Sequence, residues 1–261
     1  MASKPLYGEA ESSRTERAYL SPEIERQRRR ILERLSPKPG EHIVDIGCGP
    51  GLLAREFSVA VKDDGRVTGL DASTAMLDLA RKRCGNLSNV AFIEGDATDL
   101  EIGDASADAV TCVQVLLYVP DVRQALAEIF RVLKPGGRAV IMETDWRSTV
   151  LHSHDEELTE SIIDAWDRKV ASPRLPARLR AMLRDAGFGD VAVEAFPIIS
   201  TDATPEGFSM AMMAQSADAA VEQGTISQAQ SEAWLAELRR LGADDQYFFC
   251  VNRFLFTARK A

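Results

Sequence analysis

The sequence contains few cysteines, no surplus of basic residues and no long apolar run. Its four cysteines, Cys48, Cys84, Cys112 and Cys250, form no CxxC pair, which predicts free thiols in a reducing cytoplasm rather than a zinc site or disulfides. The formal net charge of −9 argues against a nucleic-acid partner, because such proteins present a basic face to the phosphate backbone.

The sequence also contains no recognisable signal for membrane insertion or export. No stretch approaches the roughly 20 consecutive apolar residues of a membrane-spanning helix. The polar residues 1–17 contain no apolar core of a signal peptide. We therefore expect a cytoplasmic protein without a membrane span.

Short apolar segments alternate with amphipathic segments between residues 42 and 144. Strands are expected at 42–46, 66–70, 90–95, 107–116 and 137–144, and helices at 51–61, 73–84 and 122–133. Such alternation is typical of a parallel sheet with helices on both faces. Ahead of it, Ser21 as N-cap and Pro22 at the first helical position predict one more helix.

The pattern loosens after about residue 145. Beyond it we expect helices near 154–170 and 176–187, a strand at 190–199, a Met-rich helix from Thr204, a helix opened by a capping box of Ser227 and Gln230, and a final strand at 247–258. The segments 146–175 and 200–244 are too long for simple sheet connections. We interpret both as covers over a functional site.

One glycine-rich stretch, VDIGCGPG at residues 44–51, follows the first expected strand. A glycine turn between a strand and a helix lets a ligand lie directly against the backbone. A nicotinamide dinucleotide fingerprint would need a third glycine at position 52, where the sequence has Leu52. The stretch therefore favours a different cofactor, and a nicotinamide-linked oxidoreductase is a distant alternative.

Four motifs in order, VDIGCGPG, GLDAS, EGDATDL and RVLKPGG, resemble those of class I methyltransferases that use S-adenosylmethionine (SAM). Over residues 40–145 the chain resembles the small-molecule methyltransferases related to the ubiquinone and menaquinone biosynthesis (UbiE-like) enzymes. The resemblance implies an α/β, Rossmann-like, seven-stranded and mostly parallel sheet with helices on both faces and a helical cover from the C-terminal insertions. It also implies an N-terminal arm and helix over the cofactor site at 1–36 and a methyltransferase domain at 37–261.

The resemblance further implies which residues bind SAM. Gly47, Cys48, Gly49 and Gly51 would lie against the methionyl and ribose portions, where a Cβ facing the ligand would collide. Asp45 would orient the ammonium group and Asp71 would bind both ribose hydroxyls. Ala72 and Met76 would flank the adenine, Asp96 and Ala97 would bind its edge, and Gln114 would lie beneath the methionyl tail.

Several of these assignments have structural alternatives. Asp45 could instead cap a turn or helix, Asp71 could be the N-cap of the following helix, and Asp96 could be a turn aspartate. Arg28 is charged but falls on the apolar stripe of the first helix. Its guanidinium could bind the SAM carboxylate, or its side chain could extend to water.

The methyl acceptor is less defined by the sequence. Candidate catalytic residues are Tyr118, His152 and His154. Glu143 and Asp145 are also expected near the opening of the site. For the two histidines a solvated surface loop, a general base and a metal ligand all remain open, and we assign no metal site. The Met-rich helix could line an apolar acceptor pocket or simply pack in the core.

These features predict transfer of a methyl group from SAM to a small, partly hydrophobic molecule at oxygen, carbon or nitrogen. QVLLYVPD after the fourth strand lacks the D/N-P-P-Y/F motif, which disfavours methylation of nucleic-acid bases. The alternative is a catalytically silent protein that binds SAM as a sensor or partner. We expect a monomer or a homodimer.

Overall fold

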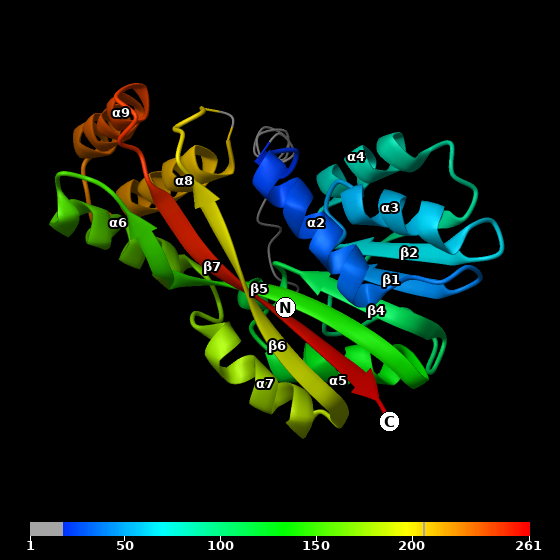
Figure 1. The fold of residues 1–261 in the computed structure, drawn as a ribbon. Coiled ribbons are helices and arrows are strands. Elements are labelled where there is room, and N and C mark those ends of the chain that lie inside the picture. Colours follow the sequence, from blue (N-terminus) through cyan, green and yellow to red (C-terminus); the bar gives the residue numbers. More distant parts are fainter. Residues whose placement is uncertain (1–17, 206) are drawn as a thin grey trace.

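The computed structural model describes residues 18–205 and 207–261 (Figure 1). Residues 1–17, which make up most of the expected N-terminal arm, lie outside the described residues. No helix among the described residues is both long and apolar enough to cross a bilayer.

A seven-stranded sheet forms the centre of the protein, in the order β3-β2-β1-β4-β5-β7-β6. The strands are β1 (His42–Ile46), β2 (Arg66–Asp71), β3 (Val90–Glu94), β4 (Ala107–Val113), β5 (Leu133–Leu151), β6 (Phe188–Ser200) and β7 (Phe249–Lys260). The first five strands are parallel, and β7 runs antiparallel to both β5 and β6. The expected fold class is therefore confirmed.

The strand order reverses between β1 and β4, because β2 and β3 lie on one side of β1 and the later strands lie on the other. In parallel α/β sheets the crevice at such a reversal, outside the carboxyl ends of the strands, is where ligands bind. The glycine-rich stretch begins within β1 and continues beyond its carboxyl end, so it lies at this crevice.

Helices cover both faces of the sheet. They are α2 (Pro22–Leu35), α3 (Leu52–Val61), α4 (Thr74–Cys84), the short 3₁₀ helix η1 (Leu116–Tyr118), α5 (Val122–Val132), α6 (Glu156–Lys169), α7 (Leu175–Asp185), α8 (Phe208–Glu222) and α9 (Gln228–Ala243). Successive strand residues point to opposite faces. Ile43 accordingly packs in the core beneath α2 and α3, and Val44 packs in the core beneath α5 and α7.

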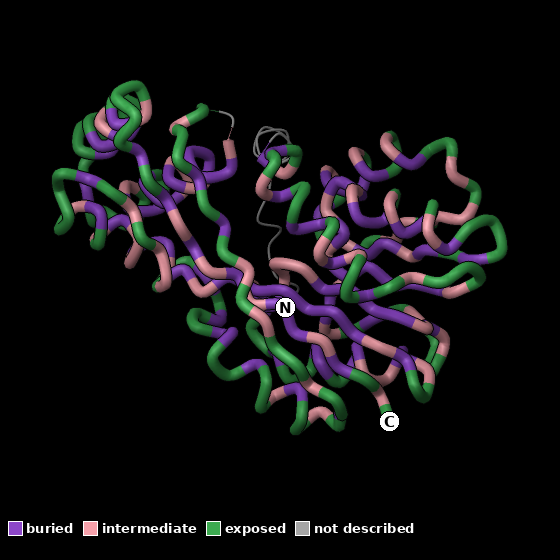
Figure 2. Tube along the Cα trace, viewed as in Figure 1, coloured by how far each residue is buried: buried purple, intermediate pink, exposed green. Residues whose placement is uncertain are grey.

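Strands β5, β6 and β7 continue past the parallel part of the sheet and support a second lobe with α6, α8 and α9 (Figure 1). The core of this lobe contains Trp146, Trp166, Trp234 and Phe249. Figure 2 shows buried residues along the central strands and also inside this lobe. The lobe therefore has its own hydrophobic core, whether or not it also covers a functional site.

One strand boundary and two helix caps can be compared with the expectations from the sequence. Residues 146–151 do not belong to a connection, because β5 continues through them and its Leu151 pairs with Phe249. Ser21 is the N-cap of α2, but its side chain makes no capping hydrogen bond. The capping box of Ser227 and Gln230 is present at the start of α9.

Candidate active site

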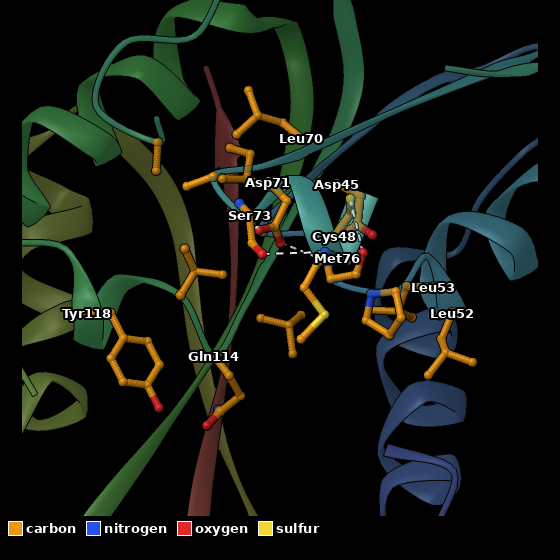
Figure 3. Close-up of a pocket in the computed structure, with 18 of the residues that line it drawn as sticks. Asp45, Cys48, Leu52, Leu53, Leu70, Asp71, Ser73, Met76, Gln114 and Tyr118 are labelled. Atoms are coloured by element: carbon orange, nitrogen blue, oxygen red, sulfur yellow. Dashed lines mark hydrogen bonds between the residues drawn. The ribbon is translucent and has the colours of Figure 1, made fainter. Parts of the chain in front are cut away.

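A cavity of about 230 Å³ opens at the carboxyl ends of β1, β2 and β4, beneath α2 (Figure 3). Most residues expected to bind the cofactor line it: Arg28, Asp45, Gly47, Cys48, Gly49, Asp71, Ala72, Met76, Asp96, Ala97 and Gln114. Tyr118 also lines this cavity, whereas Gly51, His152 and His154 do not. Residues from separate motifs therefore meet in one pocket at the crevice where the strand order reverses.

The three glycines of the turn serve different purposes, although all three have a left-handed backbone. A Cβ on Gly49 would meet no atom within 4 Å, so this position faces open space in the pocket. A Cβ on Gly47 would come 2.1 Å from the Val115 side chain, and one on Gly51 would come 2.9 Å from Ala80 Cβ. The expectation that all three are small to admit the ligand is thus wrong for Gly47 and Gly51, because a Cβ there would meet protein atoms first: the Val115 side chain at Gly47, and helix α4 at Gly51.

Asp71 at the end of β2 is tied to the glycine turn. Its Oδ2 accepts a hydrogen bond from the Gly49 N–H at 2.8 Å, and its Oδ1 accepts one from the Ser73 N–H at 2.9 Å. Burial raises the pKa of this carboxyl group, and the backbone donors oppose that shift. The N-cap of α4 is Ser73 rather than Asp71, so the alternative role as a helix cap does not apply.

Asp45 is fully enclosed at the base of the pocket. Its Oδ1 accepts a hydrogen bond from the Thr111 hydroxyl at 2.7 Å, and its Oδ2 has no hydrogen-bond partner among the described residues. Burial raises the pKa of Asp45 to about 7, and nearby Asp71 adds to that rise. A buried carboxylate oxygen without a donor, beside an open glycine turn, fits a ligand that brings its own ammonium group.

Asp96 and Arg28 already have protein partners. Asp96 Oδ1 accepts hydrogen bonds from the N–H and the hydroxyl of Thr98, both at 2.8 Å, which shows that it does stabilise a turn. The Arg28 guanidinium donates to Glu56 at 2.9 Å and to the Tyr19 carbonyl at 2.6 Å. Arg28 is 8% exposed, so the alternative in which its side chain extends to water is wrong.

Gln114 and Tyr118 line the pocket beyond β4, from the segment that follows that strand (Figure 3). Gln114 has a left-handed backbone with φ of 59°, an unusual conformation for a residue with a side chain and one that is concentrated at functional sites. Its side-chain N–H donates to the Met142 carbonyl at 3.1 Å, and its carbonyl oxygen accepts from the Thr144 hydroxyl. Both ends of this amide are therefore held in place.

The buried carboxyl group of Glu143 supports the short helix that carries Tyr118. Glu143 Oε1 accepts hydrogen bonds from the N–H groups of Val115 at 3.2 Å and Leu116 at 2.8 Å. Burial raises the pKa of Glu143 to about 8, against the effect of these donors and of Arg253. Glu143 does not line the cavity, so it acts on the pocket through the position of the helix.

His152 and His154 lie away from the pocket, which corrects their assignment as catalytic candidates. Both are exposed, and their rings contact each other at 5.8 Å between centroids. The His154 backbone N–H donates to Glu237 of α9 at 2.7 Å, which places this segment against the second lobe. No group of three or more possible metal-ligating side chains occurs within residues 18–205 and 207–261.

The pocket lining includes further residues that the sequence did not predict, among them two polar side chains, Gln27 of α2 and Arg253 of β7. Both have a recognisable signal in hindsight. Gln27 interrupts the apolar stripe that contains Ile24 and Ile31, and Arg253 lies between Val251 and Leu255 on the inward side of its strand. A polar residue at a position that the periodicity assigns to the core marks a candidate site.

Comparison with known proteins identifies the domain that holds this pocket. Residues 44–141 match the family model described as "Methyltransferase domain". The chain is 33% identical over 230 residues to an uncharacterised 37.1 kDa protein in transposon TN4556 of Streptomyces fradiae, covering 88% of this chain and 65% of that protein. It is 35% identical over 169 residues to the O-methyltransferase cnsE of Penicillium expansum, covering 63% and 58%.

Demethylmenaquinone methyltransferase of Staphylococcus carnosus is 40% identical over 117 residues, which cover 45% of this chain and 48% of that enzyme. The chain thus spans between about half and two thirds of the length of these curated relatives. The family match falls on residues 44–141, the part of the chain that contributes most of the pocket lining.

Solved structures show the same fold. YcgJ of Bacillus subtilis has a TM-score of 0.64 at 20% identity, covering 90% of this chain and 98% of that chain. A Haemonchus contortus phosphoethanolamine N-methyltransferase 2, solved with S-adenosylhomocysteine, has a TM-score of 0.64 at 24% identity, covering 97% and 58%. Residues 44–141 therefore match a methyltransferase domain, and the chain is similar to class I methyltransferases of the UbiE-like kind.

Proposed function

We propose that this protein transfers a methyl group from SAM to a small, partly hydrophobic molecule. The observation that carries the proposal is the paired arrangement of Asp71 and Gly49 at the point where the strand order reverses. It provides a carboxylate for a sugar and an open backbone turn for the atoms attached to that sugar. The methyltransferase family match over the same residues supports this interpretation.

The described residues suggest a place for each part of the cofactor. Asp71 would accept hydrogen bonds from the ribose hydroxyls, and Met76 and Ala72 would cover the adenine, whose edge would meet Asp96 and Ala97. Asp45 would accept a hydrogen bond from the ammonium group through its open oxygen. Gly47, Cys48 and Gly49 would lie along the part of the cofactor that joins the ribose to the ammonium group. When bound, SAM supplies an electrophilic methyl group on a sulfonium.

The protein's contribution to such a transfer is alignment in a site that excludes water. Good orientation of two reactants can contribute roughly 7–11 kcal/mol to lowering a barrier. Gln114 and Tyr118 line the side of the pocket beyond β4, where an acceptor would approach. A general base is needed only where the attacking atom carries a proton. Tyr118 is the candidate for that role or for a hydrogen bond to the acceptor.

The acceptor side of the pocket favours a small molecule with apolar surface. Ile24, Tyr118 and Val119 line it, and the core of the second lobe begins directly behind Ile24 and Tyr118. The named relatives include an O-methyltransferase and a demethylmenaquinone methyltransferase, so hydroxyl oxygens and quinone-like molecules are the first acceptors to test. Under this proposal α2 covers the cofactor, and the second lobe shapes the acceptor space of a cytoplasmic enzyme.

Calorimetric titration with SAM and S-adenosylhomocysteine tests the proposal, followed by transfer of a radiolabelled methyl group to a panel of phenols, quinols and amines. We expect binding of both nucleosides by the wild type and its loss in Asp71→Ala. Asp78→Asn is the matched control, because Asp78 is an exposed carboxylate on neighbouring α4. Absence of SAM binding would refute the proposal, and tight binding with no transfer to any acceptor would instead support a silent SAM-binding protein.

A further inference from the structure

Gln27 of α2 presents a buried amide group to the pocket. The residue is 3% exposed and lines the cavity. A buried polar side chain costs free energy unless its hydrogen-bonding groups have partners. Gln27 lies between Ile24 and Ile31 on the buried face of the helix, so its presence there needs an explanation.

Within the described part of the chain, this amide has a partner for its oxygen but none for its nitrogen. Gln27 Oε1 accepts a hydrogen bond from the Arg253 guanidinium, whereas Nε2 has no hydrogen-bond partner among residues 18–205 and 207–261. A guanidinium can only donate, so the amide cannot turn over and its NH₂ group is fixed on the other branch. Because the side chain is part of the cavity lining, this NH₂ group is an oriented donor for a bound molecule.

A second amide in the pocket wall shows the contrast. Gln114 also lines the cavity, but its side-chain N–H already donates to the Met142 carbonyl at 3.1 Å. Its carbonyl oxygen accepts from the Thr144 hydroxyl. The Gln114 amide is thus used to fix the protein, whereas the donor of Gln27 is left for a ligand.

Successive residues of α2 face opposite sides of the pocket. Arg28 donates to Glu56 of α3, the helix that follows the glycine-rich turn. Gln27 instead contacts Arg253 of β7, whose guanidinium carbon lies 4.7 Å from the centroid of the Phe208 ring of α8. The Gln27 amide therefore lies on the side of the pocket next to the second lobe, where the acceptor is proposed to bind.

The lining near this amide is apolar. Ile24 lies one helical turn before Gln27 on the same face of α2, and it also lines the cavity. Tyr118 contributes an aromatic ring to the lining, and both Ile24 and Tyr118 contact the core of the second lobe. A molecule bound there would meet apolar side chains together with an N–H donor.

We infer that the methyl acceptor carries a carbonyl oxygen on an apolar body, and that Gln27 Nε2 donates a hydrogen bond to this oxygen. The inference rests on the proposed function and adds to it a chemical class of acceptor and a residue that determines specificity. A carbonyl oxygen has two lone pairs and no proton, so it matches an NH₂ group. An analogue with a methylene group in place of the carbonyl leaves the donor without a partner, and the site should reject it.

The test uses the full chain saturated with S-adenosylhomocysteine and titrated with hydroxyaryl ketones. Each ketone is paired with the hydroxyaryl alkane that has a methylene group in place of the carbonyl. Loss of one hydrogen bond to a buried donor corresponds to about a fivefold or larger difference in affinity, so the wild type should prefer the ketone by that ratio in at least one pair. Gln27→Met, which removes the amide but retains the length of the side chain, should bind both members of the pair equally.

Gln27→Glu separates the donor from the contact with Arg253. Its carboxylate can still accept a hydrogen bond from the guanidinium but has no N–H group. This variant should therefore match the wild type in thermal unfolding and still lose the preference for the ketone. Both variants should bind S-adenosylhomocysteine with the affinity of the wild type, because the amide lies on the acceptor side.

The control is Gln228→Met, since Gln228 is an exposed glutamine on α9 outside the pocket lining, and it should retain the preference. A wild type that binds no ketone better than its methylene analogue overturns the inference, whether or not the Gln27 variants fold. So does a Gln27→Glu variant that keeps the preference, and weaker binding of S-adenosylhomocysteine in that variant would then assign the amide to the cofactor carboxylate. Failure of the wild type to bind S-adenosylhomocysteine would be a failure of the proposed function instead.

Discussion

The backbone N–H of Gly49 donates a hydrogen bond to Asp71 Oδ2 at 2.8 Å, which joins the first glycine turn to the tip of the second strand. The Cys48 N–H donates to the Leu70 carbonyl at 2.9 Å and strengthens the same connection. The two motifs are separated in the sequence but are joined in the pocket by these two hydrogen bonds. A change at Asp71 should therefore affect both the ligand and the turn.

Asp71→Asn should weaken binding of S-adenosylhomocysteine roughly 10- to 100-fold, since hydrogen bonds to a charged group contribute about 1.5–3 kcal/mol. An asparagine retains the size of the side chain but replaces one acceptor oxygen with an N–H donor. Calorimetry gives the affinity, and thermal unfolding reports any loosening of the turn. Unchanged affinity in Asp71→Asn would contradict the ribose assignment, and Asp78→Asn should behave as the wild type in both measurements.

The glycines at positions 49 and 51 should separate ligand binding from packing. Gly51→Ala should lower the free energy of unfolding by about 1–3 kcal/mol, because its Cβ would overlap Ala80 in α4. Gly49→Ala has open space and should lose about 1 kcal/mol or less from its left-handed backbone, yet weaken nucleoside binding at least tenfold.

Gly136→Ala is the control for this pair, since Gly136 also has a positive φ and open surroundings but lies outside the pocket. It should reproduce the small loss of stability in Gly49→Ala without any change in affinity. Chemical denaturation and calorimetry on the three variants check these expectations. Normal affinity in Gly49→Ala would mean that the ligand does not lie against this turn.

The sheet and the cofactor half of the pocket were predictable because their signals are local. Apolar strands alternate with amphipathic helices; Asp45 lies one residue before the end of the first strand and Asp71 is the last residue of the second. The second lobe was less predictable, because residues 146–151 become strand only by pairing with β7, about 100 residues later. Arg253 reaches the pocket for the same non-local reason, through the antiparallel placement of β7 beside β5.

His152 and His154 show a second limit of the sequence. Two histidines beside acidic residues suggest a catalytic role, but the fold places them on the exposed side of the second lobe.

We expect the double variant His152→Ala, His154→Ala to transfer methyl groups at a rate within twofold of the wild type. Tyr118→Phe should instead reduce kcat for acceptors with a protonated hydroxyl, and a radiolabel assay compares the two. A large loss in the histidine variant would contradict this assignment.

Glu143 should control stability through its buried neutral carboxyl group. Glu143→Leu leaves the N–H groups of Val115 and Leu116 without an acceptor, which costs about 1–3 kcal/mol for each group. Glu143→Gln retains that acceptor. It should be close to the wild type in stability near pH 5.

The pH dependence distinguishes these two effects. The folded-state pKa of Glu143, about 8, lies above the ordinary value of 4.5, so its stabilising contribution is complete below about pH 4.5 and is lost as the pH rises toward 8. Glu143→Gln lacks this loss and should gain up to about 1.4 kcal/mol per pH unit relative to the wild type across that range. Urea denaturation between pH 5 and 8 measures the difference, and parallel curves would show that Glu143 does not titrate.

Asp45 should make cofactor binding depend on pH. Its pKa is raised to about 7 by burial, so the carboxyl group is mostly protonated below that pH in the free protein. An ammonium group beside Oδ2 favours the ionised form. Affinity for S-adenosylhomocysteine should therefore increase as the pH rises from 5.5 to 7, by at most about tenfold per unit, and level off above pH 7.

Asp45→Asn removes the titrating group and should give weaker binding with a shallower dependence on pH. Any slope that remains belongs to Asp71, whose pKa is also raised by burial. Calorimetry in buffers of different ionisation enthalpy adds an independent measurement, the number of protons released per ligand bound. At pH 6 this number should be larger for the wild type than for Asp45→Asn. A wild type that binds equally well at pH 5.5 and 7.5 without proton release would show that the ammonium group does not meet Asp45, and this group would have to be assigned to another part of the pocket.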